Sequence, residues 1–136
     1  MIHYRYSEAD NILYVKYKGE TTIEDIVNYV TEIAMDEQLP RVLYTLEDRS
    51  EAIIKHTVRE NVLIYQALKE HRKNFRMVKV ASVNPTPESA TSALQFSHIL
   101  ATRLKKYHFR VFATREAALQ WLMHETPAPM EHPAAG

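Results

Sequence analysis

The pattern that most constrains the fold is a regular alternation of short apolar strands with amphipathic helices. The first 18 residues are typical of a β-hairpin, because IHYRY and ILYVKYK alternate apolar and polar residues on either side of the turn residues SEADN. Three further strand patterns follow, RVLYTLE, RMVKVASV and FRVFA, and a helical pattern comes after every strand except the first. The predicted order is therefore ββαβαβαβα.

This order predicts the fold class. Strands that alternate with helices are usually parallel and joined by right-handed crossovers. The first strand should be antiparallel, because a tight turn joins it to the second. We therefore expect one α/β domain with a mostly parallel five-stranded sheet over residues 1–124. The segment 125–136 is rich in proline and alanine and has no periodicity, so we expect it to be disordered or loosely attached.

Threonines mark the expected helix starts. Asp25 and Glu60 each lie three residues after a threonine, which is the spacing of a capping box, with Asp25 in place of the usual Glu or Gln. Pro87 suits the first position of the third helix. The four predicted N-caps are Thr22, Thr57, Thr86 and Thr114.

The spacing of apolar residues predicts the buried face of each helix. For the first helix the face is Ile23, Ile26, Val27, Val30, Ile33 and Ala34. For the second it is Val58, Val62, Tyr65 and Leu68. For the third it is Ala90, Ala93, Leu94, Ser97, Leu100, Ala101 and Leu104, which leaves Phe96 and Ile99 outside. Apolar residues outside the stripe predict burial on two sides or a partner contact, and we expect a homodimer.

Composition excludes several function classes. Seventeen basic residues balance 17 acidic ones, which argues against a nucleic-acid-binding domain. The chain has no cysteine, so disulfides and thiolate chemistry are excluded. No apolar run approaches the roughly 20 residues of a transmembrane helix, and the N-terminus lacks a signal-peptide pattern. We therefore expect a cytoplasmic protein.

The motifs of common active sites are also missing. The only glycines are Gly19 and Gly136, too few for a glycine-rich phosphate loop, and there is no GxSxG nucleophile elbow. The seven histidines are dispersed and none has metal-ligand spacing. We therefore expect no catalytic residue, no metal and no cofactor.

The end of the chain carries a family resemblance. The segment VFATREAALQWL resembles the end of bacterial proteins related to the sporulation anti-sigma-factor antagonist, which finish with an aromatic strand, a short spacer and a Glu-Ala-Leu-x-Trp-Leu-like helix. Here the matching residues are Glu116, Ala117, Leu119, Trp121 and Leu122, with one extra alanine. With the similar element order, they make the chain similar to the STAS/SEC14-like superfamily.

The resemblance implies parallel strands in sequence order, wound as a (βα) superhelix, and a binding or regulatory module rather than an enzyme. Antagonist members bind a partner kinase, and SEC14-like relatives bind lipids. The leading expectation is thus a non-catalytic regulatory module that acts through a protein partner. The alternative is a carrier or sensor of a lipid or other small amphipathic ligand.

The antagonists are switched by phosphorylation of a serine after the third strand, and Ser50 in LEDRSEA is its closest counterpart by position. Glu51 stands where those proteins have glycine, and its charge opposes an added phosphate. Ser50 therefore remains a weak candidate phosphoacceptor. The alternative is a solvated loop in which Arg49 pairs with Asp48 or Glu47.

Two surfaces complete the candidate sites. Ligands of open parallel sheets favour the carboxyl ends of the strands, where helix N-termini attract anions. We expect such an anion rim at Arg49, Ser82, Asn84, Thr86 and Thr114.

Alternate polar residues also interrupt the strands. They predict an uncovered basic sheet face, which would meet a partner, a second subunit or an anionic headgroup, with Thr45 on the same side. The alternative is that the long cationic side chains pack their stems and extend their charges to water. The basic residues of this face are Arg5, Lys16, Lys79 and Arg110.

Overall fold

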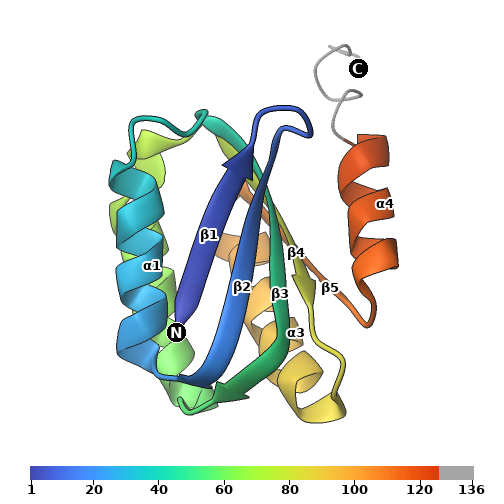
Figure 1. The fold of residues 1–136 in the computed structure, drawn as a ribbon. Coiled ribbons are helices and arrows are strands. Elements are labelled where there is room, and N and C mark those ends of the chain that lie inside the picture. The colour runs from blue at the N-terminus through green and yellow to red at the C-terminus, as the bar shows by residue number, and fades with distance from the viewer. Residues whose placement is uncertain (126–136) are drawn as a thin grey trace.

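The computed structural model describes residues 1–125, which form a five-stranded sheet with helices on both faces (Figure 1). The strands lie side by side in sequence order. The first pair is antiparallel and every later pair is parallel, which confirms the predicted fold class and strand directions. Of the expected tail, residues 125–136, Glu125 is the last residue of the final helix and residues 126–136 lie outside the described part. The strands are β1 (Ile2–Ser7), β2 (Ile12–Thr21), β3 (Val42–Ile54), β4 (Met77–Val83) and β5 (Tyr107–Phe112).

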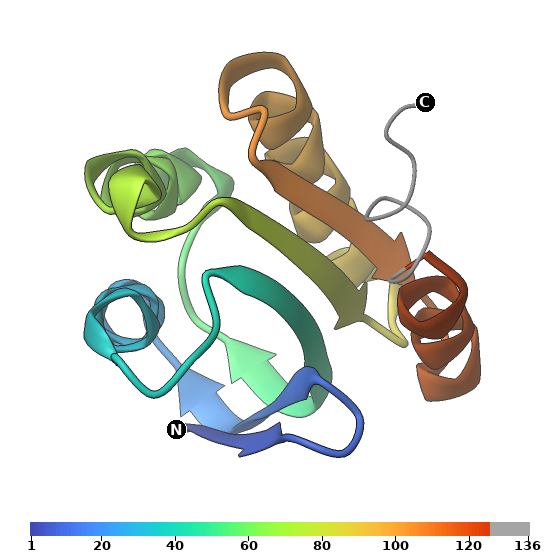
Figure 2. The same cartoon turned by 90° about the horizontal axis from the view of Figure 1, so that it is seen from above.

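The helices divide unequally between the two faces of the sheet. Three long helices cover one face, and the last helix covers part of the other (Figure 2). The expectation of one uncovered face is therefore wrong in part, because α4 buries its own apolar side chains there. The helical elements are α1 (Ile23–Met35), η1 (Val58–Glu60), α2 (Asn61–Glu70), η2 (Arg72–Asn74), α3 (Pro87–Arg103) and α4 (Arg115–Glu125).

The predicted caps are present. Thr22 and Asp25 form a reciprocal capping box at α1, and Thr57 and Glu60 form another at η1. These bonds satisfy N–H groups that have no partner inside the first helical turn. The last two predicted caps act in the same way. The side chain of Thr86 accepts a hydrogen bond from the N–H of Ser89, and that of Thr114 accepts one from the N–H of Ala117.

The predicted face of the second helix is wrong in part. Tyr65 and Leu68 pack against the core as predicted. Val58 and Val62 are about half exposed, whereas Asn61, Ile64 and Ala67 are buried. The prediction assumed a continuous α-helix from Thr57, but Val58–Glu60 is a 3₁₀ turn. A 3₁₀ turn advances by about three residues per turn rather than 3.6, so it rotates the face that the following helix presents.

The predicted face of the third helix is also wrong in part. Leu94 is 55% exposed, and Phe96, expected to lie outside the stripe, is buried. Phe96 packs edge-on against Phe109 of β5, with ring centroids 5.6 Å apart. Neighbouring strand β5, and not the helix pattern alone, sets which residues of α3 face inward.

Two hydrophobic clusters lie on opposite faces of the sheet. The larger one fills the space between the sheet and α1, α2 and α3. The smaller one joins the sheet to α4, where Ala118 and Leu122 are fully buried. The strand alternation in β2, β3 and β4 supplies both clusters, because successive side chains point to opposite faces.

Candidate functional site

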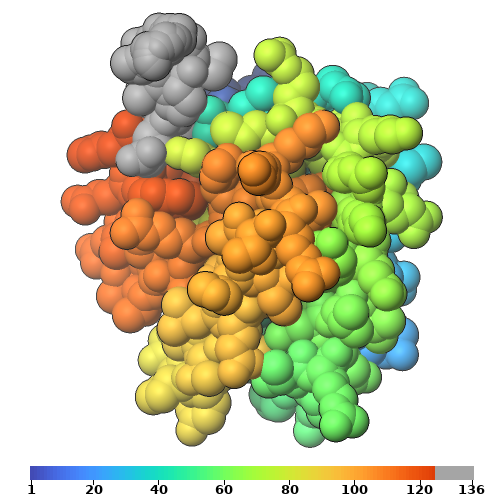
Figure 3. Space-filling view, turned by 180° about the vertical axis from the view of Figure 1, so that it is seen from behind, coloured from blue at the N-terminus to red at the C-terminus, as the bar shows by residue number. Residues whose placement is uncertain are grey.

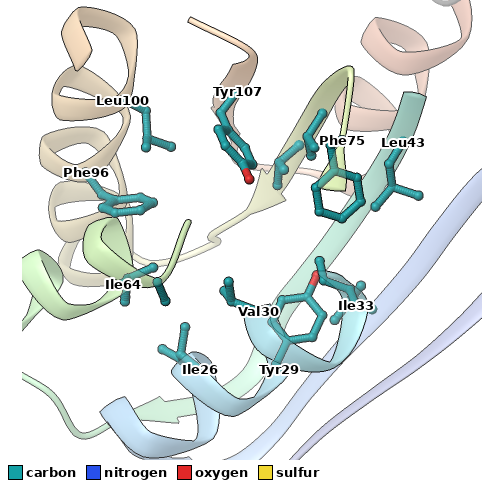
Figure 4. Close-up of a cluster of buried hydrophobic side chains, with 14 of the residues drawn as sticks. Ile26, Tyr29, Val30, Ile33, Leu43, Ile64, Phe75, Phe96, Leu100 and Tyr107 are labelled. Atoms are coloured by element: carbon teal, nitrogen blue, oxygen red, sulfur yellow. The ribbon is translucent and has the colours of Figure 1, made fainter. Parts of the chain in front are cut away.

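A cavity lies inside the larger cluster, between the sheet and three helices. Its walls are mostly apolar and come from β2–β5, α1, α2 and α3. Figure 4 shows Ile26, Ile64, Phe96 and Tyr107 directed toward a common space from different elements. The cavity offers about 50 Å³ to water-sized molecules. Because one water needs roughly 10–15 Å³ on this measure, the space holds a few small groups.

A buried ion pair lies in the middle of β3, beside this cavity. Glu47 and Arg49 are two residues apart on the strand, so both point to the helix-covered face that carries the cavity. A guanidinium nitrogen of Arg49 lies 3.1 Å from a carboxylate oxygen of Glu47, and both side chains are largely buried. Two opposite charges therefore neutralise each other inside the protein.

Two tyrosines complete the surroundings of Glu47. The hydroxyl of Tyr29 donates to one carboxylate oxygen at 3.1 Å, and that of Tyr17 donates to the other at 3.4 Å. Burial first, and then the charge of Glu47, raises the pKa of both phenols above their ordinary value. Both hydroxyls therefore stay protonated and act as donors. Arg49 also stacks on the Tyr17 ring, 4.6 Å from its centroid.

His56 and Asn61 add a neutral pair from the segment that leads into α2. His56 Nε2 lies 2.9 Å from Asn61 Oδ1, so this ring nitrogen carries the proton. Burial, opposed in part by this bond, lowers the pKa of His56, and the charge of Arg49 lowers it further. The imidazole is therefore neutral at neutral pH, with Nδ1 as an acceptor.

Four buried polar atoms around this cavity have no hydrogen-bond partner within the described residues. Buried polar groups in folded proteins almost always have a partner, because each unpaired group costs free energy. Their gathering around one cavity marks a place where water or another small molecule can supply the partners. We call these residues the polar end of the cavity; the atoms are Thr45 Oγ1, Arg49 Nε, His56 Nδ1 and Asn61 Nδ2.

The polar end of the cavity lies near the boundary between two helices. Helix α2 packs mainly on α1, and α3 packs mainly on β5, so α2 and α3 hold each other only weakly. A furrow separates their N-terminal ends on the surface (Figure 3). Asn61 of α2 and Ser92 of α3 both line the cavity, which places its polar end near this furrow.

The structure separates the residues of the expected anion rim. Only Arg49 reaches the cavity. Ser82 and Asn84 are buried and hydrogen-bonded to each other at 2.8 Å. Thr86 and Thr114 cap exposed helix starts, and the helix after Thr114 lies on the opposite face of the sheet. Anion binding along the whole rim stays a prediction.

Ser50 lies in a strand and not in a loop. The loop expectation is wrong because β2 and β3 continue to pair beyond a bulge, up to Thr21 and Ile54. Ser50 is exposed, and its hydroxyl donates to an Asp48 carboxylate oxygen at 2.6 Å. Arg49 pairs with Glu47, one of the two partners considered for it. Phosphorylation of Ser50 stays a prediction.

Strand register places the four expected basic residues on the face that carries α4, whereas Thr45 points to the opposite face and lines the cavity. Lys79 is 6% exposed and its ammonium lies 5.0 Å from the centre of the Trp121 ring. Arg110 also lies over that ring, at 5.9 Å. Trp121 therefore divides the basic sheet face, and the role of this face in binding stays a prediction.

Sequence reasoning missed several of the polar groups around the cavity. Tyr29 and Asn61 lie outside the stripes predicted for the first and second helices, and both are buried. His56 was counted only among the dispersed histidines. One signal was available: Glu47 ends the apolar run RVLYTLE, and an acid within a buried strand requires a partner.

Comparison with known proteins supports the fold. The chain is similar to the crystal structure of an uncharacterized protein of the DUF3478 family, with a SpoIIAA-like fold, from Shewanella loihica. The TM-score is 0.56 at 21% identity, over 90% of this chain and 92% of that one. This chain therefore has the SpoIIAA-like fold, the fold of anti-sigma-factor antagonists, as the resemblance implied. No protein-family model matches the chain, and the search of curated proteins found no match.

The described helices show no membrane-spanning segment. None of those within residues 1–125 combines the length and the apolar character that crossing a bilayer requires. The same residues contain no group of three or more His, Asp or Glu side chains placed to hold a metal ion.

Proposed function

We propose that the protein is a non-catalytic module that binds a small amphipathic molecule in the cavity. The observation that supports this function is the polar end: four unpartnered polar atoms around an otherwise apolar cavity. Binding sites for small molecules commonly combine apolar walls with a few convergent polar groups that fix orientation. This is the carrier or sensor expected as the alternative from the sequence.

The surroundings of Glu47 favour binding over catalysis. A catalytic acid or base needs a free position from which it exchanges a proton with its substrate. Both Glu47 oxygens accept hydrogen bonds from tyrosine hydroxyls, and one also pairs with Arg49. The carboxylate therefore acts as the anchor that holds Arg49 in place.

The proposal is tested by filling the cavity. Ala93 is buried in its wall, so Ala93→Phe should occupy the space and abolish binding. Ala101→Phe changes an exposed position of the same helix and is the matched control. Native mass spectrometry of the purified chain detects a retained ligand, and NMR titration with butyrate, 1-butanol and pyrrole detects binding of added molecules.

We expect at least one added molecule to shift cavity resonances in the wild type and in Ala101→Phe, but not in Ala93→Phe. A bare polypeptide mass with no cavity shift from any of the three would contradict the proposal. Equal binding by the two variants would place the bound molecule elsewhere on the surface.

A second candidate function, contact with another protein chain, is favoured by an exposed apolar patch. Its members are about half exposed and lie at the end of β3, in η1 and at the start of α2, where solvent exposure of several apolar side chains is unfavourable. They are Ile53, Val58, Val62 and Leu63.

Self-association is the simplest form of this function and the one expected from the sequence. Sedimentation over a range of concentrations should show a dimer that Val62→Lys disrupts. Arg103→Lys, on a different helix, is the control. A monomer at all concentrations would exclude a second copy of the chain as the occupant of this patch.

A further inference from the structure

We propose that the ligand is a small monocarboxylate, held with its carboxylate among Arg49, His56 and Asn61 and its carbon chain along the apolar walls. This inference rests on the proposed function, because it names the ligand of the same cavity.

The unpartnered atoms determine the chemistry of the ligand head. Arg49 Nε and Asn61 Nδ2 are donors, so they require an acceptor oxygen. Glu47 cannot serve both, because its oxygens already accept from Tyr17, Tyr29 and another nitrogen of Arg49. A carboxylate presents two acceptor oxygens in one plane, which matches the planar guanidinium. An ammonium group would leave both donors unpartnered and would repel Arg49.

Charge balance favours a single negative charge. In the empty site Glu47 and Arg49 cancel, and His56 is neutral. A bound carboxylate adds one negative charge, which protonation of His56 neutralises. His56 Nδ1 then changes from acceptor to donor and points its proton at the ligand. A doubly charged phosphate would leave one buried charge uncompensated, which is costly.

The polar groups around His56 come from three elements. Arg49 on β3 disfavours the imidazolium, and Glu60 on η1 favours it. Glu47 lies on the same strand as Arg49 and offsets its charge. Neutral Asn61, at the start of α2, accepts from the opposite ring nitrogen and keeps the ring oriented. An incoming carboxylate therefore shifts this balance toward the protonated ring.

The size of the cavity limits the carbon chain. About 50 Å³ holds roughly three to five water-sized groups, which corresponds to a carboxylate with a short apolar chain. The walls next to this space, such as Val30, Ile64 and Phe96, have no hydrogen-bonding side chains. They suit an unsubstituted hydrocarbon body.

The test compares three probes of nearly equal size: butyrate, its neutral isostere butyramide, and butylammonium. We expect butyrate to bind the full-length chain at least about tenfold more tightly than butyramide, a difference of about 1.4 kcal/mol. Butylammonium should not bind. Calorimetry in two buffers of different ionisation heat should show proton uptake with butyrate, and His56→Gln should abolish the uptake.

Asn61→Leu removes one donor at the polar end and should reduce the preference for butyrate over butyramide. Butyramide that binds as well as butyrate, or butyrate that binds without proton uptake, would overturn this inference and leave the proposed function intact. If no probe binds and cavity-filling Ala93→Phe behaves like the wild type, the proposed function fails as well.

Discussion

The two faces of the sheet hold charged side chains in different ways. Under α1, α2 and α3, the charged groups Glu47 and Arg49 neutralise each other, and polar atoms around a cavity lack partners. Under α4, the cations Lys79 and Arg110 lie over the ring of Trp121, beside tightly packed Ala118 and Leu122.

The difference separates a binding arrangement from a structural one. A cation over an aromatic ring gains an additional electrostatic attraction from the negative potential of the ring face. A buried ion pair orients several donors and acceptors at once, and under the proposed function those left over would select a ligand. The same sheet therefore carries a candidate recognition site on one face and a packed layer on the other.

The largest expected effect is on the ion pair. Arg49→Met leaves Glu47 as an unpaired buried carboxylate and should lower the free energy of unfolding by about 3–5 kcal/mol. The double variant Glu47→Gln/Arg49→Met removes both charges and should recover most of this loss. Urea denaturation of the two variants measures the difference. Similar destabilisation by both would show that packing, and not charge, holds this face.

The second effect tests the α4 face. Leu122 is fully buried, so Leu122→Ala should cost about 3 kcal/mol by leaving a cavity. Since Leu122 lies on the far side of the sheet, binding of butyrate to the remaining folded protein should not change. Urea denaturation and NMR titration measure the two quantities. Loss of butyrate binding by folded Leu122→Ala would remove the distinction between the faces.

The third effect is a pH dependence of stability. The pKa of His56 is lowered by burial, so the unfolded chain takes up the proton more readily. The stability that neutral His56 contributes is present above its unfolded pKa, about 6.5, and is lost as the pH falls toward the folded pKa. His108, on the α4 face, has its pKa lowered by burial and then by Lys79.

Urea denaturation between about pH 7.5 and pH 5.5 should show stability falling in the wild type. The fall should be smaller in His56→Gln. His108→Gln is the matched variant, and because His108 is more exposed its effect should be smaller. An unchanged pH dependence in His56→Gln would mean that His56 is not buried in its neutral form.

The smallest effect concerns an exposed cation. The guanidinium of Arg115 lies 5.4 Å from the centre of the Tyr14 ring, at the exposed start of α4. Arg115→Gln should cost no more than about 0.5–1 kcal/mol, because water weakens such contacts. Thermal unfolding compares it with the wild type. A loss as large as that of Leu122→Ala would show that the α4 face also depends on its cations.

Local patterns in the sequence predict the strands and the helix starts, because these features depend on residues close together in the chain. Alternating residues predict strands, and a threonine with an acid three residues later predicts a helix start, as the capping boxes at Thr22 and Thr57 confirm. The prediction of buried helix faces failed where neighbouring elements determine which residues point inward. The 3₁₀ turn before α2 rotated its buried face, so that Asn61 became buried and Val62 exposed. This failure lies at the candidate site, where polar residues replace apolar ones.

By itself, the sequence determined the element order, the strand directions and the helix starts, because each follows from residues near one another in the chain. Only the tertiary structure decided which polar side chains meet. Glu47 and Tyr29 are separated by 18 residues and come together only because β3 and α1 pack face to face. The cavity also results from tertiary packing. Its volume is the space left between side chains of seven elements, and no local sequence pattern predicts that volume.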